Sequence, residues 1–187
     1  MPEHSWQAEV SRQVWRLQLI VAAMVIGSLV FLAVVLVLVY SGAAREAALE
    51  LPLSYVLAVF AVAALAARAV VPAAIVSNAR RRIREGVWQP LQPSNVPQGV
   101  QAFLEQTGDA GKLWQVLMSR TIIAAATLEG VAFFACITYM LEHSWPSLVV
   151  AVVFIACLAL HVPSQTGVIL WIEEQLRLID EERQLGR

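Results

Sequence analysis

The sequence predicts an all-α integral membrane protein, a four-helix transmembrane bundle. Of its 187 residues 59% are apolar and only 14% are charged, whereas in soluble domains about a quarter of the residues are charged. Four long apolar runs follow one another, and the connections within the first pair and within the second pair are short. No alternating apolar and polar pattern of a membrane barrel is present, so helices are the predicted elements.

Each apolar run is long enough to cross a hydrocarbon core of about 30 Å as a helix. Lipid offers no partner to a free backbone amide or carbonyl, and a continuous helix satisfies these groups within the segment. Each run is therefore predicted to form one transmembrane helix. The predicted limits are residues 19–40, 51–77, 120–141 and 146–171.

Basic residues give the predicted orientation. They cluster before the first run, in the segment 78–119 and after the fourth run, whereas the two short loops hold a single one, Arg45. Lysine and arginine are enriched on the cytoplasmic side. We therefore expect both termini and the loop 78–119 to be cytoplasmic, in a protein of a bacterial inner membrane that forms a single transmembrane domain.

The segments outside the runs carry local signals. Prolines at 90, 93 and 97 predict an irregular stretch, Val100–Gln106 is predicted to be a short helix, and Asp109 is expected to cap a helix leading into the third run. Beyond Trp171, residues 172–187 predict an amphipathic cytoplasmic helix with an apolar stripe. The partner of this stripe is predicted to be the chain's own loop, a second copy or another protein.

The two halves of the chain resemble each other and predict a tandem duplication of a helical hairpin. Both contain an Ala-x-x-x-Gly motif, Ala23 to Gly27 in the first run and Ala126 to Gly130 in the third. Small residues four positions apart let membrane helices approach closely. We expect these four residues to lie in helix contacts, within the chain or between copies of an oligomer.

The polar residues inside the runs fall at similar depths. Arg68, Glu129 and His161 each lie roughly 13 to 15 Å from the inner end of their run, and Ser28 lies roughly 18 Å from it. Intramembrane ionisable groups usually face the bundle interior and pair with one another. The predicted arrangement is a polar layer with an Arg68–Glu129 ion pair, to which His161 is bonded unless it bonds Ser28 instead.

Two functions fit this layer. In the first, the protein is a non-catalytic subunit or scaffold and the layer locks the bundle in register. In the second, it translocates or senses protons or a monovalent cation, with Glu129 as the exchanging carboxylate, because carboxylates and histidines next to charges can change protonation.

The stretch 124–141, AAATLEGVAFFACITYML, resembles the carboxylate helix of rotary-ATPase proteolipid (c-type) subunits. There a glutamate lies among small residues in a helix that runs outward from the cytoplasm, and the resemblance implies ion exchange at Glu129. The chain departs from that family by lacking a glycine-rich partner helix, by its long cytoplasmic segment and by Arg68. Its layout is also similar to small uncharacterised bacterial four-span proteins, and that likeness implies no activity.

Other classes of function have no support in the sequence. It contains no phosphate-binding glycine loop, no His-Glu-x-x-His motif and no nucleophile–base pair, so no enzyme, metal or cofactor is expected. The net charge of −1 gives no sign of nucleic-acid binding. The cluster Arg80, Arg81, Arg82 and Arg84 either contacts anionic lipid headgroups or serves only as a topology signal.

Overall fold

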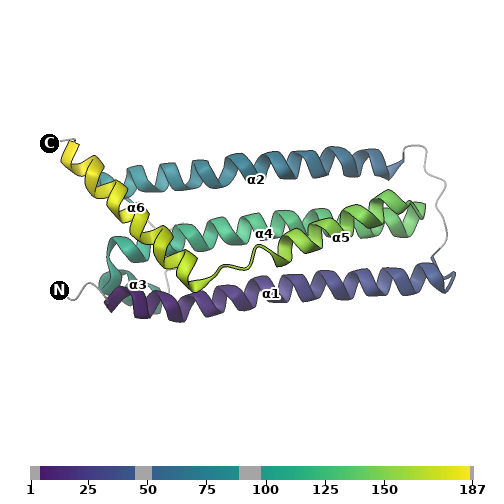
Figure 1. Ribbon diagram of the computed structural model, residues 1–187, viewed down its shortest axis with the longest axis horizontal. Coiled ribbons are helices and arrows are strands. Elements are labelled where there is room, and N and C mark those ends of the chain that lie inside the picture. Colours follow the sequence, from purple (N-terminus) through teal and green to yellow (C-terminus); the bar gives the residue numbers. More distant parts are fainter. Residues whose placement is uncertain (1–4, 45–51, 89–97, 186–187) are drawn as a thin grey trace. The chain divides into compact units, whose positions relative to one another are not determined.

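The computed structural model describes residues 5–44, 52–88 and 98–185, which form six α-helices and no strand. Figure 1 gives their order along the chain. They are α1 (Ser5–Tyr40), α2 (Leu53–Arg84), α3 (Gln98–Thr107), α4 (Asp109–Glu142), α5 (Trp145–Ala159) and α6 (Gln165–Leu185). The all-helical prediction is confirmed for these residues. Most of the predicted first loop and the proline-rich stretch 89–97 lie outside them.

Three of the helices, α1, α2 and α4, are long and apolar enough to cross a membrane. They have 36, 32 and 34 residues; α1 and α4 contain the first and third predicted runs, and α2 contains the second run from residue 53 onward. A protein with three such helices is embedded in a membrane.

The fourth apolar run does not form the single helix predicted for 146–171. It folds as α5, which has 15 residues, and as the first turns of α6, with a break from Leu160 to Ser164. Pro163 is the physical reason, because proline has no N–H for the helix and disfavours helical backbone at the residue before it. A helix of 15 residues extends about 22 Å, short of a hydrocarbon core of about 30 Å.

The predicted loop 78–119 is largely helical where the structure describes it. The second helix continues to Arg84, past the predicted end of its run at residue 77. The predicted helix Val100–Gln106 lies within α3, and α4 begins at Asp109, the residue that was predicted to cap it. The C-terminal helix is also confirmed, although it begins at Gln165 rather than at residue 172.

The chain divides into two compact units. Unit 1 contains residues 1–18, 72–121 and 163–187, and unit 2 contains residues 19–71 and 122–162. The long helices α1, α2 and α4 contribute residues to both units.

In unit 2, α4 contributes more buried residues than any other helix. Aromatic pairs hold both other long helices against it: Phe31 of α1 meets Phe133 at 5.0 Å, and Phe60 of α2 meets Phe134 at 5.8 Å between ring centroids, both edge to face. Such pairs contribute about 0.5–1.5 kcal/mol beyond their buried area. Small side chains of α4 are fully buried here, namely Ala125, Ala132, Ala135 and Cys136.

In unit 1, the apolar stripe of α6 is covered by the chain itself. Ile172 and Ile179 are 0% and 1% exposed, and Val168 and Gln175 are also buried. The predicted partners were the chain's own loop, a second copy or another protein, and in the structure the stripe is buried within the chain itself. The guanidinium of Arg120 on α4 also lies 5.9 Å from the ring of Trp171 on α6, within the range of a cation–π interaction.

The connection between α3 and α4 is tight. Gly108 has a φ of +59°, a left-handed conformation that glycine adopts without steric cost. At Gly111 the backbone of α4 approaches α3 closely, since a Cβ there would meet Thr107 Oγ1 and would come within 3.2 Å of the Phe103 ring.

Candidate functional site

In unit 2, a polar contact joins the side chains of Arg68 and His161. Arg68 Nη2 lies 3.3 Å from His161 Nδ1. A guanidinium has only donors, so Nδ1 accepts and the imidazole carries its proton on Nε2. Both residues are half-buried. The contact therefore ties the middle of α2 to the segment that follows α5.

His161 lies in the break between α5 and α6, not on a helix face as predicted. Its backbone N–H still bonds the carbonyl of Leu158 at 3.0 Å, so the chain leaves α5 through one tight turn. Pro163 prevents the helix from continuing. The imidazole thus reaches Arg68 from an irregular segment.

The predicted ion pair between Arg68 and Glu129 is not formed. Glu129 is half-buried on α4, at the edge of the buried small-residue stripe, and its carboxylate has no hydrogen bond or ion pair with the part of the chain that the structure describes. Opposite charges at equal depth suggested the pair. In the structure the guanidinium of Arg68 contacts His161 instead of Glu129.

Ser28, the fourth member of the predicted layer, is buried on α1. Its hydroxyl oxygen has no hydrogen-bond partner among the described residues, so the expected bond to His161 is not formed. The predicted layer is therefore not one connected network. Of its four members, Arg68 and His161 are in contact with each other.

The predicted Ala-x-x-x-Gly contacts are not made within the chain. A Cβ placed on Gly27 or on Gly130 would meet nothing within 4 Å, and Ala23 and Ala126 are exposed. These helix faces therefore have no close neighbour in the described chain. Contact with another chain through the same residues stays a prediction.

Glu142 has a role that sequence reasoning missed. Its carboxylate accepts hydrogen bonds from the backbone N–H groups of Leu53 and Ser54 at the start of α2, the latter at 3.2 Å to Oε2. The first N–H groups of a helix have no partner within it, and a negative charge there is favourable. The last residue of α4 thus caps α2, 89 positions away in the chain.

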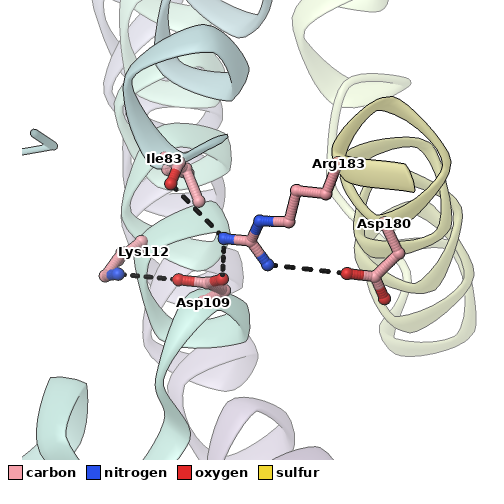
Figure 2. Close-up of polar contacts among 5 residues, drawn as sticks. All are labelled: Ile83, Asp109, Lys112, Asp180 and Arg183. Atoms are coloured by element: carbon pink, nitrogen blue, oxygen red, sulfur yellow. Dashed lines mark hydrogen bonds and ion pairs between the residues drawn. The ribbon is translucent and has the colours of Figure 1, made fainter. Parts of the chain in front are cut away.

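Unit 1 contains a second polar cluster, shown in Figure 2. Arg183 of α6 lies 2.9 Å from Asp109 Oδ2 and donates to the backbone oxygen of Ile83 at 3.4 Å. Lys112 lies 2.6 Å from the other oxygen of Asp109, and Asp180 lies 3.5 Å from Arg183. The cluster joins α2, α4 and α6.

The charge state of Asp109, which precedes the apolar run 120–141, follows from these contacts. Its partial burial alone would raise the pKa of the carboxyl, but hydrogen bonds and charge attraction from Lys112 and Arg183 outweigh that effect. The pKa of Asp109 is therefore lowered from its ordinary value. Asp109 stays ionised and available to both cations near neutral pH.

The four arginines of the predicted lipid-headgroup cluster divide into two groups. Arg80 and Arg84 each lie 3.2 Å from the carboxylate of Glu182 on α6. Arg81 and Arg82 are exposed and form no ion pair with the described residues. The sequence indicates the cluster, but not which of its members the chain itself uses.

No group of three or more histidine, cysteine, aspartate or glutamate side chains among the described residues could hold a metal ion. Cys136 is buried and Cys157 is exposed, and neither forms a disulfide.

A scan against protein-family models, a search of curated proteins and a search of solved structures each found no match to this chain, so its likeness to proteolipid subunits and to small bacterial four-span proteins stays a prediction.

Proposed function

We propose that this protein is a non-catalytic membrane subunit or scaffold of an oligomer or a larger membrane complex, with cytoplasmic termini. The contact between Arg68 and His161 at 3.3 Å carries the proposal. It engages Arg68, which lies well inside the second apolar run, with a residue of the same chain. A side chain engaged in this way holds helices together rather than presenting a charge to a substrate.

The energetics of α2 support a structural role for this contact. A charged side chain at the centre of a membrane helix costs at least about 2.5 kcal/mol, and a hydrogen-bond partner reduces this cost. Within unit 2, α2 buries only Leu57 and Ala64 among its described residues. Its position therefore depends on a few contacts: the Phe60–Phe134 pair, the contact with His161 and the cap provided by Glu142.

A double-mutant cycle tests whether the contact between Arg68 and His161 stabilises the helix bundle. The variants Arg68→Gln, His161→Phe and their combination are compared by thermal unfolding in detergent. We expect each single variant to be destabilised, and a coupling energy of about 0.5–3 kcal/mol, because the two residues share one contact. Strictly additive effects would show that the contact does not hold α2.

The proposed assembly is tested separately, on the wild-type protein. Native mass spectrometry after extraction in several mild detergents should reveal either a homo-oligomer or co-isolating membrane subunits. A monomeric mass in every detergent would contradict the proposal.

A second candidate function is exchange of a proton or cation at Glu129. The observation that favours it is the half-buried carboxylate in α4, which has no ion pair within the described chain. Carboxylates in membrane helices often mark ion pathways. The lack of an internal cation leaves Glu129 available to an ion or to a group from another chain.

Proton flux in proteoliposomes tests this second function. Wild-type protein is compared with Glu129→Gln, and Glu105→Gln is the matched control because Glu105 is exposed on α3, outside the apolar runs. A flux that is lost only in Glu129→Gln supports exchange. Equal flux in all three proteins would contradict ion exchange at Glu129 and would favour the scaffold function.

A further inference from the structure

The last turns of α2 present three different surfaces. Ala79 and Ile83 are buried and face the core of unit 1. Arg80 and Arg84, four positions apart on a second face, both pair with Glu182. The four arginines therefore differ in their roles, although they are close in sequence.

Arg81 and Arg82 lie on the remaining face of α2. Successive residues of a helix are separated by about 100°, which turns these two side chains away from Glu182. Both are exposed, and neither has a hydrogen bond or ion pair with the described residues. The acidic residue of the same turn, Glu85, lies 3.8 Å from Arg84 instead. Two adjacent guanidinium groups are thus left without an anion.

The level of these arginines along α2 matches a membrane–water interface. Arg81 follows residue 77, the predicted end of the apolar run, by four residues, a distance of about 6 Å along the helix axis. The chain then turns at Gly86, whose φ is +71°, and presents Val87 at 60% exposure. Two cations next to an exposed apolar side chain suit a surface that contacts both headgroups and acyl chains.

We propose that Arg81 and Arg82 form a binding site for the phosphate groups of acidic phospholipid headgroups. A guanidinium offers paired N–H donors in a plane, which match two oxygens of one phosphate. An acidic lipid adds a net negative charge that a zwitterionic lipid lacks, and juxtamembrane basic side chains are attracted to such lipids. The neighbouring Arg80 and Arg84 do not take part, because both are held in ion pairs with the Glu182 carboxylate.

Because Arg80 and Arg84 are paired with Glu182, a variant of these two arginines is a matched control for a variant of Arg81 and Arg82. The full-length protein in detergent is melted with added phosphatidylglycerol, with added phosphatidylcholine or with inorganic phosphate at the same concentration. Three proteins are compared: wild type, the pair Arg81→Gln with Arg82→Gln, and the pair Arg80→Gln with Arg84→Gln. Native mass spectrometry counts the lipids bound to each protein.

Phosphatidylglycerol should raise the melting temperature of the wild type and remain bound to it in the mass spectrometer, whereas the other two additives should have little effect. The variant pair at 81 and 82 should melt like the wild type without lipid but lose most of the lipid-dependent shift and of the bound lipid. The pair at 80 and 84 should melt lower without lipid, since Glu182 loses both partners, yet keep the shift.

Three results would overturn the site. The first is an unchanged lipid-dependent shift in the 81 and 82 pair, and the second is an equal loss of the shift in both pairs. The third is a shift with inorganic phosphate as large as that with phosphatidylglycerol, which would identify an anion site without lipid selectivity. If a variant does not fold, Arg81→Lys with Arg82→Lys retains both charges and should bind an intermediate amount of lipid.

Discussion

Arg183 Nη2 lies 2.9 Å from Asp109 Oδ2, and this ion pair joins the last turn of α6 to the first turn of α4 across 74 positions of sequence. The same guanidinium also bonds the carbonyl of Ile83 on α2. One side chain thus connects three helices of unit 1 (Figure 2).

Removing this ion pair should weaken unit 1 moderately. Both partners are partly exposed, and pairs of this kind contribute about 0.2–1 kcal/mol. We expect Arg183→Gln and Asp109→Asn each to lower the melting temperature slightly, whereas Asp180→Asn, which removes only the longer contact at 3.5 Å, should have a smaller effect. Equal effects of all three variants would contradict the prediction that the Arg183–Asp109 ion pair contributes more to stability than the Arg183–Asp180 contact.

Acidification should destabilise unit 1 through the same carboxyl. The pKa of Asp109 is lowered in the folded protein, so the unfolded chain binds protons more readily. The stability that this group provides is therefore fully present above its unfolded pKa near 3.8 and is lost as the pH falls through the lower folded value. Melting curves between about pH 6 and pH 2 should show an acid-dependent difference between the wild type and Asp109→Asn.

Glu142→Ala should loosen the start of α2. Loss of a helix cap costs about 0.5–2 kcal/mol, and the carboxylate also carries a favourable charge at the helix N-terminus. Glu105→Ala is the matched control, because Glu105 is exposed on α3 and has no ion pair among the described residues. Thermal unfolding together with hydrogen exchange at Leu53 and Ser54 measures the effect. Unchanged exchange at these two amides would show that Glu142 does not cap α2.

The buried stripe of α6 should be sensitive to truncation. Ile179 is 1% exposed, and Ile→Ala at such a site typically costs about 2–5 kcal/mol. Leu185→Ala, on the same helix but at 88% exposure, should be nearly neutral. Limited proteolysis should cut α6 faster in Ile179→Ala than in the control. Similar digestion of the two variants would mean that α6 is not held by its stripe.

Two glycines in comparable helices should respond differently to alanine. Gly111→Ala places a methyl group against Thr107 and Phe103 and should destabilise the contact between α3 and α4. Gly27→Ala meets nothing within 4 Å and should stabilise α1 by up to about 1 kcal/mol through helix propensity. A loss of stability in Gly27→Ala would instead indicate that another chain packs on this face.

The helical class and three of the long helices follow from the sequence because apolar length alone decides them. The short α3 and the start of α4 at Asp109 were also predictable from local signals in the sequence. The carboxylate of Asp109, however, pairs with Lys112 and Arg183. The prediction of a single helix for the fourth run was wrong, because hydropathy does not reflect the backbone restriction that Pro163 imposes.

The polar contacts were less predictable than the helices. Depth along each run placed Arg68, Glu129 and His161 at one level, but pairing depends on the rotation of each helix about its axis and on where a helix breaks. Glu142 was missed for a related reason. Its partner groups are backbone amides at the start of α2. No residue type identifies such amides in the sequence, so the contact could not be predicted from it.

If α5 lies in the bilayer, as predicted for the fourth run, its short length should make the chain sensitive to bilayer thickness. At about 22 Å it is roughly 8 Å shorter than a typical hydrocarbon core, whereas α1 at 36 residues exceeds that core by more than 20 Å. A thin bilayer matches α5 and leaves more of α1 in the headgroup region, whereas a thick bilayer draws the non-helical backbone around His161 toward the acyl chains. Within unit 1, the Gln18 side-chain amide donates a hydrogen bond to the Pro163 carbonyl at 2.8 Å, which satisfies one backbone acceptor of the break between α5 and α6.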